Sequence, residues 1–368
     1  MSRIVAAAPA VPVHRYSQAE ITGVLEPLLT HDPGRAAVMR RIHASSGVEN
    51  RNLVMELDRY SGLDSFHEAN DLFISAGTDL AEQATRDALS SAGIRADEVD
   101  FVLFTSVTGV AAPSIDAQLA TRVGMRSDVK RLPSFGLGCV AGAAGLARVH
   151  DYLVGHPHDV AVLVSVELCS LTVQLGDDSM ANIVASGLFG DGAAAVVVVG
   201  DDFAAERGLD GPDVIDTRSS LYPQTEDVIG WDIGGSGFRI VLSAGVPDVI
   251  AKHFAGDVHA LLGEHDLSVG DVSTWLAHPG GPKVLEAFAT ALGLTDAALA
   301  PSWRALAATG NQSSAAVLGI LADALRTPAP GETGLLFALG PGVTAELVLL
   351  RWPEHPAPLE DASGNIAA

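Results

Sequence analysis

The chain has little cysteine: only Cys139 and Cys169 occur among its 368 residues. Two thiols exclude a disulfide framework and a zinc site built from several thiolates. A single bridge between them is possible by count, but we do not expect one in a reducing cytoplasm. The scarcity of cysteine therefore favours a protein with neither a disulfide scaffold nor a thiolate-based zinc site.

Lysine is almost as scarce as cysteine. It occurs only at positions 130, 252 and 283, and the formal net charge is −23. Because nucleic acids bind to basic surfaces, this composition argues against a nucleic-acid partner. A small anionic ligand would need a local basic patch. The densest arginine cluster, which fits either such a patch or a solvated helix face, comprises Arg35, Arg40, Arg41 and Arg51.

Long apolar runs are also missing. No stretch of about eighteen residues is free of charges and helix breakers, so no membrane span is predicted. The N-terminal apolar run is short and is interrupted by Pro9 and Pro12, which argues against a signal peptide. We therefore expect a cytoplasmic protein. The C-terminal tail, residues 353–368, is rich in Pro, Glu and Ala and is predicted to be disordered.

The chain is rich in hydrophobic residues, which occur in short runs. Hydrophobic residues make up 48% of the chain and charged residues 18%, enough for a substantial interior. Short apolar runs alternate with alanine-rich helical stretches, which is typical of an α/β protein with a sheet covered on both faces. The predicted strands are 101–106, 160–166, 193–199, 274–277, 335–339 and 345–350, and the predicted helices are 75–92, 140–154, 250–262 and 313–325.

Two parts of the chain resemble each other. Residues 94–100 and 267–273 each follow a predicted helix, share the same spacing of apolar residues, and precede a predicted strand. Gly190-Asp191-Gly192 opens one apolar strand, and Gly340-Pro341-Gly342 opens another. This pattern predicts two similar halves, residues 1–205 and 206–352. The alternative is a chance similarity within a single α/β domain.

Cys139 is the first candidate for chemistry. It lies in a glycine-rich turn, residues 135–142, that leads into an alanine-rich helix. The positive end of a helix favours a thiolate, and small neighbours let a bulky substrate approach the sulfur. We therefore interpret Cys139 as a nucleophile, although a lone cysteine can also be a small apolar filler in a core.

A thiol nucleophile needs an imidazole to accept its proton. His278 follows the predicted strand 274–277 and precedes a Pro-Gly-Gly loop, a place where α/β enzymes carry catalytic side chains. His150, on the helix after Cys139, is interpreted as structural or solvated. The histidines in polar surroundings, interpreted as surface residues, are His31, His43, His67, His156, His158 and His265.

Asn311 occupies a turn before a predicted helix, as Cys139 does. It follows Val272 of the second repeat segment at nearly the same interval as Cys139 follows Val99 of the first. If the halves are duplicated, both residues point into one shared site. On local sequence alone, Asn311 could simply cap a helix.

With these segments in order, the chain resembles the type III polyketide synthases, the chalcone-synthase-like branch of the thiolase superfamily, over nearly its whole length. The motifs that carry the resemblance are Gly138-Cys139, Leu188-Phe189-Gly190-Asp191-Gly192, His278-Pro279-Gly280-Gly281-Pro282, Gly310-Asn311 and Leu339-Gly340-Pro341-Gly342.

The resemblance implies a fold, an assembly and a set of substrates. It implies a homodimer whose subunit is an αβαβα sandwich of two duplicated halves. It also implies a cofactor-free site served by coenzyme A thioesters, namely an acyl-CoA starter and a malonyl-CoA or methylmalonyl-CoA extender. The residues matched to the coenzyme A contacts are Arg41, Gly280 and Gly281, and those matched to the cyclisation-pocket loop are Gly340, Pro341 and Gly342.

The resemblance also implies the reaction. Cys139, paired with His278, takes the starter acyl group. Malonyl-CoA then loses carbon dioxide while His278 and Asn311 donate hydrogen bonds to the developing oxyanion. The resulting carbanion attacks the acyl group on Cys139, and ring closure follows repeated extension. Cys169 is expected to be a small residue beneath the active site.

Around this site the resemblance implies a gate and a cavity. Phe189 matches an aromatic gate, whereas Ile240 replaces a second gate aromatic. Trp231, where plant enzymes have glycine, is expected to block one direction of the cavity, and Ala112 to open another toward an alkyl tunnel. The full set of gate and cavity positions is Phe189, Thr172, Trp231, Ile240, Ser313, Val107 and Ala112.

The segments 107–114 and 167–172 look like those of bacterial alkylresorcinol and alkylpyrone synthases, which predicts a fatty acyl-CoA starter and a resorcinol or pyrone product. Two alternatives stay open. One is a ketoacyl synthase of fatty-acid initiation, which uses the same residue types with an acyl carrier protein. The other is a catalytically silent dimer partner or binding module.

Overall fold

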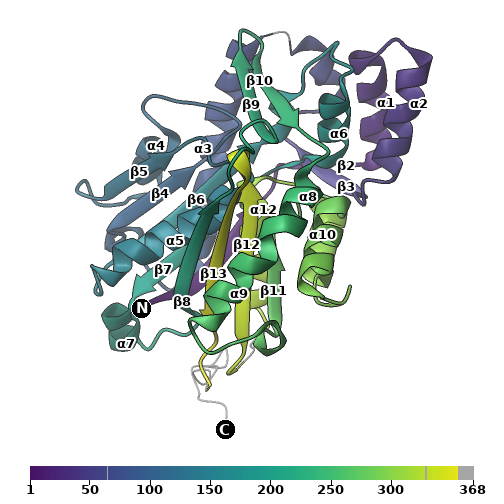
Figure 1. Ribbon diagram of the computed structural model, residues 1–368. Helices are drawn as coiled ribbons and strands as arrows, with labels where there is room; N and C mark the ends of the chain where they lie inside the picture. The colour runs from purple at the N-terminus through teal and green to yellow at the C-terminus, as the bar shows by residue number, and fades with distance from the viewer. Residues whose placement is uncertain (64, 328–329, 355–368) are drawn as a thin grey trace.

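The computed structural model describes residues 1–354 apart from 64 and 328–329, so most of the predicted disordered tail lies outside the described residues. Nine strands form the main sheet in the order β11-β12-β13-β8-β1-β7-β6-β4-β5 (Figure 1). Its strands are β1 (Ser2–Ala10), β4 (Phe101–Thr105), β5 (Lys130–Ser134), β6 (Val160–Leu168), β7 (Asp191–Gly200), β8 (Asp213–Leu221), β11 (Thr274–Ala277), β12 (Thr333–Gly340) and β13 (Thr344–Arg351).

The two halves of this sheet repeat one arrangement. In the first half β4 pairs with β6 in parallel, and β6–β7 and β7–β1 are antiparallel. In the second half β11 pairs with β12 in parallel, and β12–β13 and β13–β8 are antiparallel. The two halves join where β1 pairs with β8. The two segments that resemble each other in sequence form 3₁₀ turns, Ala96–Glu98 and Val269–Asp271, just before β4 and β11. This correspondence is what the sequence repeat predicted.

Helices fill the remaining layers. Helices α5 (Ala141–Val154) and α12 (Ser314–Leu325) pack against each other and against strands of both halves. Helix α3 (Phe66–Ala92) covers the outer face of the first half, beside α4 (Ile115–Val123), and α9 (Ala255–Gly263) and α10 (Pro282–Leu292) cover the second. Three apolar cores separate these layers. The result is the expected α/β fold, an αβαβα sandwich.

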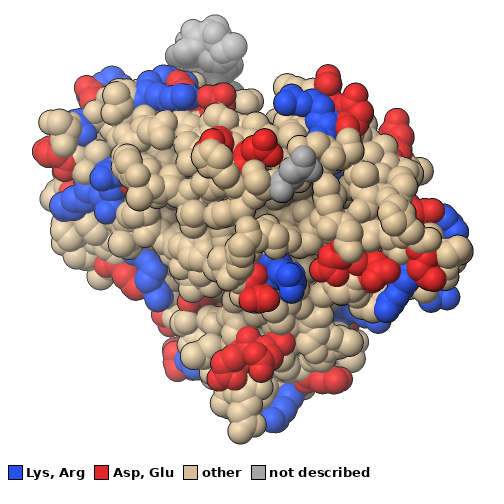
Figure 2. Space-filling model, turned by 90° about the horizontal axis from the view of Figure 1, so that it is seen from above, with Lys and Arg blue, Asp and Glu red and all other residues tan. Residues whose placement is uncertain are grey.

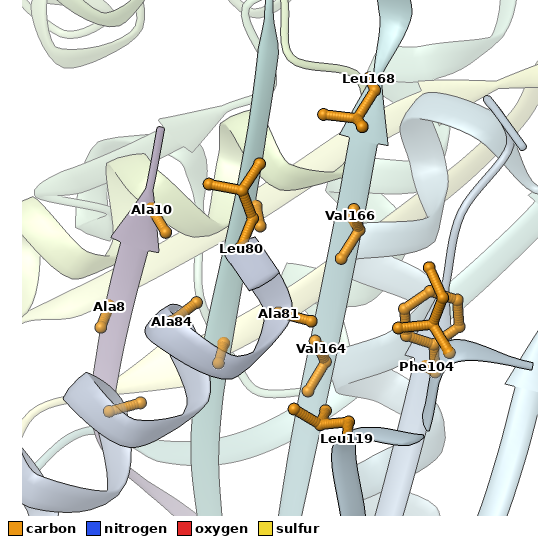
Figure 3. Close-up of a cluster of buried hydrophobic side chains, with 14 of the residues drawn as sticks. Ala8, Ala10, Leu80, Ala81, Ala84, Phe104, Leu119, Val164, Val166 and Leu168 are labelled. Carbon is orange, nitrogen blue, oxygen red and sulfur yellow. The ribbon is translucent and has the colours of Figure 1, made fainter. Parts of the chain in front are cut away.

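Small side chains let the layers approach closely. In the first core, α3 presents alanines and Leu80 toward the strands, opposite valines of β6 (Figure 3). Figure 3 labels Ala8 and Ala10 on β1, Leu80, Ala81 and Ala84 on α3, Phe104 on β4, Leu119 on α4, and Val164, Val166 and Leu168 on β6.

The other elements lie at one end of the sandwich or along its edges. A helical pair, α1 (Gln18–Leu29) and α2 (Pro33–Ala44), lies beside α6 (Met180–Leu188), and the hairpin of β9 (Ile229–Gly234) and β10 (Gly237–Leu242) lies at the same end (Figure 1). The remaining elements are β2 (His14–Ser17), β3 (Asn50–Leu53), α7 (Asp201–Arg207), α8 (Val246–Val249), the π-helical Ile250–Phe254 and α11 (Ala300–Thr309).

The structure confirms the six predicted strands and corrects several other details. Helix α3 begins at Phe66 rather than residue 75, because Ser65 caps it by accepting from the backbone N–H of Glu68. The N-terminal apolar run is strand β1. His43 is 1% exposed, not a surface residue, because its ring is hydrogen-bonded between α1 and α6.

The net charge of −23 places more acidic than basic side chains on the protein. On the face seen in Figure 2, Lys and Arg side chains are scattered among Asp and Glu. Among the described residues, no helix is both long enough and apolar enough to traverse a bilayer.

Candidate active site

Cys139 lies in a 3₁₀ turn, Gly138–Val140, that leads directly into α5. Gly138 has φ +56°, and a Cβ built there would lie 2.6 Å from the ring of Pro341. Only glycine fits both the left-handed backbone and this contact. The glycine therefore brings the cysteine turn against the Gly340-Pro341-Gly342 loop, two segments far apart in sequence.

Burial dominates the chemistry of the Cys139 sulfur. It raises the pKa of the thiol to about 12, and the Glu167 carboxylate adds to the rise, while hydrogen bonds from Ser313 and Asn311 oppose it. This is the opposite direction to the thiolate that the helix terminus predicted. The cause is desolvation: burying a negatively charged sulfur costs more free energy than the terminus of one helix contributes in stabilising it.

Asn311 connects the three sequence motifs. Its side chain lies close enough to Cys139 to oppose the rise in the pKa of the thiol, and its Nδ2 donates to the carbonyl of Gly280 at 3.4 Å. Its backbone pairs with Phe189 as an isolated bridge. The structure thus places Asn311 between the cysteine turn and the loop that carries His278, as the shared-site interpretation expected.

His278 follows β11 and is fixed by its backbone, whose N–H donates to the carbonyl of Phe337 at 2.9 Å. The side chain is 3% exposed, and neither ring nitrogen has a hydrogen-bond partner among the described residues. Burial lowers its pKa to about 3, so the imidazole is neutral at neutral pH. A neutral, unpartnered imidazole can accept a proton from a thiol or donate one hydrogen bond to an oxyanion.

Glu167, at the end of β6, was missed by the sequence reasoning. It is fully buried and accepts hydrogen bonds from the backbone N–H of Val107 at 3.1 Å, the hydroxyl of Thr108 at 2.9 Å and the hydroxyl of Ser313 at 3.2 Å. Ser314 donates to it as well. Burial raises its pKa. The sequence did contain an indication, a glutamate within an apolar strand, because glutamate is rarely fully buried unless it has polar partners.

A small cavity of about 30 Å³ lies next to Phe189 and Cys169. Four of the predicted gate and cavity residues line it: Phe189, Thr172, Trp231 and Ile240. Cys169 also lines it, as expected of a small residue at the site, and burial raises the pKa of its thiol. Further lining comes from apolar residues of α1, β3 and the turn after β3, namely Ile21, Leu25, Leu53 and Leu57.

Three other predicted cavity residues lie elsewhere. Ser313 and Val107 are buried around Glu167 rather than on the cavity surface. Ala112 is exposed, because its loop runs over the surface, held there by hydrogen bonds between Asn70 and the backbone of Val110. That Ala112 opens a tunnel stays a prediction.

The predicted coenzyme A contacts are spread over two segments. Gly280 and Gly281 follow His278 and precede α10, with Gly281 at φ +140°. Arg41 is exposed at the end of α2, whereas Arg51 is 2% exposed and does not belong to the surface arginine cluster. Pro341 touches the cysteine turn, and the carbonyl of Gly342 accepts from Thr225 at 2.8 Å. No group of metal-ligating side chains is found in the described part of the chain.

Comparison with known proteins decides the family. Residues 39–202 match the N-terminal domain of chalcone and stilbene synthases, and residues 214–353 match their C-terminal domain. The chain belongs to the chalcone and stilbene synthase family. It is a type III polyketide synthase, an acyl-transferring enzyme that uses coenzyme A thioesters. This assignment argues against the ketoacyl synthase of fatty-acid initiation and against the catalytically silent partner or binding module.

Relatives within the family differ in product. The chain is 54% identical to a 1,3,6,8-tetrahydroxynaphthalene synthase of Streptomyces peucetius subsp. caesius over 345 residues, 93% of this chain and 91% of that protein. It is 30% identical to an alpha-pyrone synthesis polyketide synthase-like protein of Mycobacterium tuberculosis over 330 residues, 86% of this chain and 83% of that protein. The crystal structure of a 1,3,6,8-tetrahydroxynaphthalene synthase from Streptomyces coelicolor aligns with a TM-score of 0.89 at 30% identity, covering 95% of this chain and 99% of that one.

Proposed function

We propose that this polyketide synthase builds a polyhydroxylated naphthalene, 1,3,6,8-tetrahydroxynaphthalene, from malonyl-CoA. The observation that carries the proposal is the 54% identity over 345 residues with a synthase of that product. Every carbon of that skeleton can come from two-carbon units left when malonyl groups lose carbon dioxide. Malonyl-CoA would therefore serve as both starter and extender.

Loading begins at Cys139. Its thiol gives a proton to the neutral His278 imidazole, the sulfur attacks the thioester carbonyl, and the coenzyme A thiolate leaves and takes up the proton. Because the pKa of the thiol is raised to about 12 and that of the imidazole lowered to about 3, the resting pair is uncharged. Proton transfer is therefore expected to accompany attack rather than precede it.

Extension uses the same residues as hydrogen-bond donors. The bond between the malonyl carboxylate and its methylene carbon breaks, carbon dioxide leaves, and the electron pair becomes an enolate on the thioester. His278 and the Nδ2 group of Asn311 donate to the enolate oxygen, a role worth about 3–4 kcal/mol per donor in comparable sites. The enolate carbon attacks the acyl group on Cys139 and releases the Cys139 thiolate, which accepts the lengthened chain for the next round.

A fatty acyl starter with an alkylresorcinol or alkylpyrone product is the second candidate. It is favoured by the apolar side of the cavity, where Ile21, Leu25, Leu53 and Leu57 could contact an alkyl chain. The 30% identity to the alpha-pyrone synthesis relative is in line with it. The identity to the naphthalene-forming relative is much higher, which places this candidate second.

A homodimer is part of the proposal. Strand β5 is the last strand of the main sheet, so one of its edges has no partner strand among the described residues. Leu132 on β5 is 48% exposed, and Phe135 and Val110 are 47% and 43% exposed. Apolar side chains along an open strand edge are a liability unless a partner covers them. Light scattering of the purified protein tests the dimer directly.

The deciding experiment is mass spectrometry of the products formed from purified protein. Malonyl-CoA alone is expected to yield the tetrahydroxynaphthalene, and Cys139→Ala is expected to yield none. Long-chain products that appear only when a fatty acyl-CoA is added would support the second candidate. Condensation that requires an added acyl carrier protein would contradict both.

A further inference from the structure

The last three carbonyl groups at the end of α6, residues 187–189, accept hydrogen bonds from three separate parts of the chain. Gln18 Nε2 donates to the first at 2.7 Å, and the backbone N–H of Asn311 donates to the second at 2.8 Å. Arg51 Nη1 donates to the third, the carbonyl of Phe189, at 2.7 Å. One of these three anchors is thus the backbone of a proposed oxyanion donor, and the segment ends in the gate residue Phe189.

A single guanidinium connects these anchors. Arg51 also donates through Nη2 to the side-chain Oε1 of Gln18 at 2.8 Å, so it fixes the first carbonyl indirectly and the third directly. Its stem packs under the bridge between Phe189 and Asn311. A Cβ built on Gly310 would lie 3.0 Å from the Arg51 side chain, and one built on Gly190 would lie 3.5 Å from it. The Arg51 side chain therefore packs against both segments that form the bridge.

Arg51 is an unusual choice of anchor. It is 2% exposed, and burial lowers its pKa to about 10, so it stays a cation at neutral pH. Its Nε has no hydrogen-bond partner in the described part of the chain, and the buried carboxylate of Asp191 favours its charge from a distance. Burying a charge is costly even with an opposite charge nearby, and a neutral donor could bind the carbonyls at a helix end at less cost. Charge-assisted hydrogen bonds are, however, shorter and about twice as strong as neutral ones.

We propose that Arg51 is a positioning residue that sets the place of the Asn311 carboxamide for malonyl-CoA decarboxylation. By donating to the carbonyl of Phe189, and to the Gln18 side chain that holds the carbonyl of Gly187, it fixes the segment to which the backbone of Asn311 is bonded. The side chain of Asn311 must lie within hydrogen-bond reach of an enolate that exists only during the reaction, and a misplacement of about 1 Å can lower a rate about 100-fold. This inference rests on the proposed function, in which Asn311 is an oxyanion donor.

The test compares Arg51→Gln, Arg51→Lys and Gln18→Leu in the full-length protein, with release of carbon dioxide from malonyl-CoA as the assay. For Arg51→Gln, kcat is expected to fall about tenfold or more while KM for malonyl-CoA stays within about twofold. The kcat of Arg51→Lys is expected to fall less, because the lysine ammonium can donate to one of the two acceptors. Gln18→Leu removes one anchor but keeps the charge of Arg51, so it is expected to show the same split with a smaller loss, even if Arg51→Gln folds poorly.

Hydrogen exchange separates positioning from general stability. The amides of Gly190 and Asn311 are hydrogen-bonded across the bridge, so both are expected to exchange faster in Arg51→Gln. The amide of Ser170, bonded to Asp191 at 2.8 Å, is expected to stay protected. Arg3→Gln is the matched control, because Arg3 donates to the carbonyl of Leu209 at 3.1 Å beside strand β1, away from the site. It is expected to lower the melting temperature without changing kcat.

Each outcome bears on the inference. Wild-type kcat in the Arg51 and Gln18 variants would overturn it, as would a loss of kcat in Arg3→Gln equal to that in Arg51→Gln at equal loss of stability. A wild-type protein that releases no carbon dioxide from malonyl-CoA would overturn the proposed function, and this inference with it. An active wild type with unaffected variants would overturn the inference alone.

Discussion

The backbone N–H of Ser313 donates to the side-chain Oδ1 of Asn311 at 2.8 Å. Ser313 has φ +48° and gives its hydroxyl to Glu167, so its position is held from two sides. With Oδ1 occupied, the amide nitrogen of Asn311 faces the carbonyl of Gly280 at 3.4 Å. The carboxamide is therefore oriented with its donor group on the side of the His278 loop, which suits it to hold an oxyanion.

Replacing Asn311 with aspartate tests that orientation. The Asn311→Asp variant keeps the acceptor for the N–H of Ser313 but loses the Nδ2 donor. Decarboxylation of malonyl-CoA is expected to fall about 100-fold to 1,000-fold in kcat, as when one oxyanion donor is removed elsewhere. The assay is carbon dioxide release, with the melting temperature as a control for folding. A variant that keeps more than about half of the wild-type rate would contradict the donor role.

Glu167 makes the Cys139 thiol harder to ionise, since its carboxylate adds to the rise in the pKa of the thiol. In Glu167→Gln this charge is absent, so the pKa of Cys139 is expected to fall. The rate of alkylation of Cys139 by iodoacetamide should then rise at a lower pH than in the wild type. Peptide mass spectrometry follows Cys139 and Cys169 separately in the same sample. A profile that is unchanged, or that moves to higher pH, would show that Glu167 does not act through its charge.

The elements of the fold could be predicted largely because their patterns are local. Strand 274–277 was predicted with the bounds that the structure shows for β11. The duplication was visible because residues 94–100 and 267–273 each fold into a turn before a strand. The start of α3 was missed because it depends on one cap, Ser65, and not on periodicity. Strand β1 was missed because its apolar run was considered only as a possible leader segment.

The site could be predicted only as a set of residue types. Cys139 and His278 could be chosen from their place at a helix start and a strand end, whereas Asn311 followed from the sequence repeat and from the resemblance to the polyketide synthases. The protonation of Cys139 depends on how many atoms surround the sulfur, and no local pattern contains that information. The burial of Arg51 and His43 likewise depends on α6 lying against α1 and α2, a tertiary arrangement that the polarity of these residues conceals.

Gly138 allows a test of the contact between the two loops. Gly138→Ala has two destabilising effects. The alanine must adopt a left-handed backbone at φ +56°, and its Cβ would lie 2.6 Å from Pro341. Gly93→Ala is the matched control, because Gly93 has φ +63° and nothing within 4 Å of such a Cβ. The control is expected to lose about 1 kcal/mol in the free energy of unfolding and keep its activity. Gly138→Ala is expected to lose more, about 2–4 kcal/mol, together with most of the activity. Equal losses in the two variants would mean that the loops can separate freely.

His43 makes stability depend on pH. Burial and the nearby charge of Arg51 lower its pKa to about 4, so the folded protein keeps the imidazole neutral where an unfolded chain binds a proton. The stability that this neutral form contributes is present above about pH 6.5 and is lost as the pH falls toward 4, by on the order of 3 kcal/mol. His278 contributes in the same direction. Denaturant unfolding between pH 7 and 4 should therefore show a smaller loss in His43→Gln than in the wild type. A steeper loss in the variant would contradict this assignment.

Trp231 sets the size of the cavity from the β9–β10 hairpin. Its ring lies 5.9 Å from that of Phe238, and its side chain lines the cavity together with Phe189 and Ile240. In Trp231→Gly the indole is gone and the cavity opens toward the hairpin. The variant is expected to accept longer fatty acyl-CoA starters, with kcat/KM for them rising about tenfold relative to malonyl-CoA, because the indole no longer excludes the chain. Ile240→Val is the matched control, because it removes only one methylene from the same wall and should change the product pattern little. Competition assays with mixed acyl-CoA starters, read by mass spectrometry, give the ratio directly. An unchanged ratio in Trp231→Gly would show that starter choice is made elsewhere than at this wall.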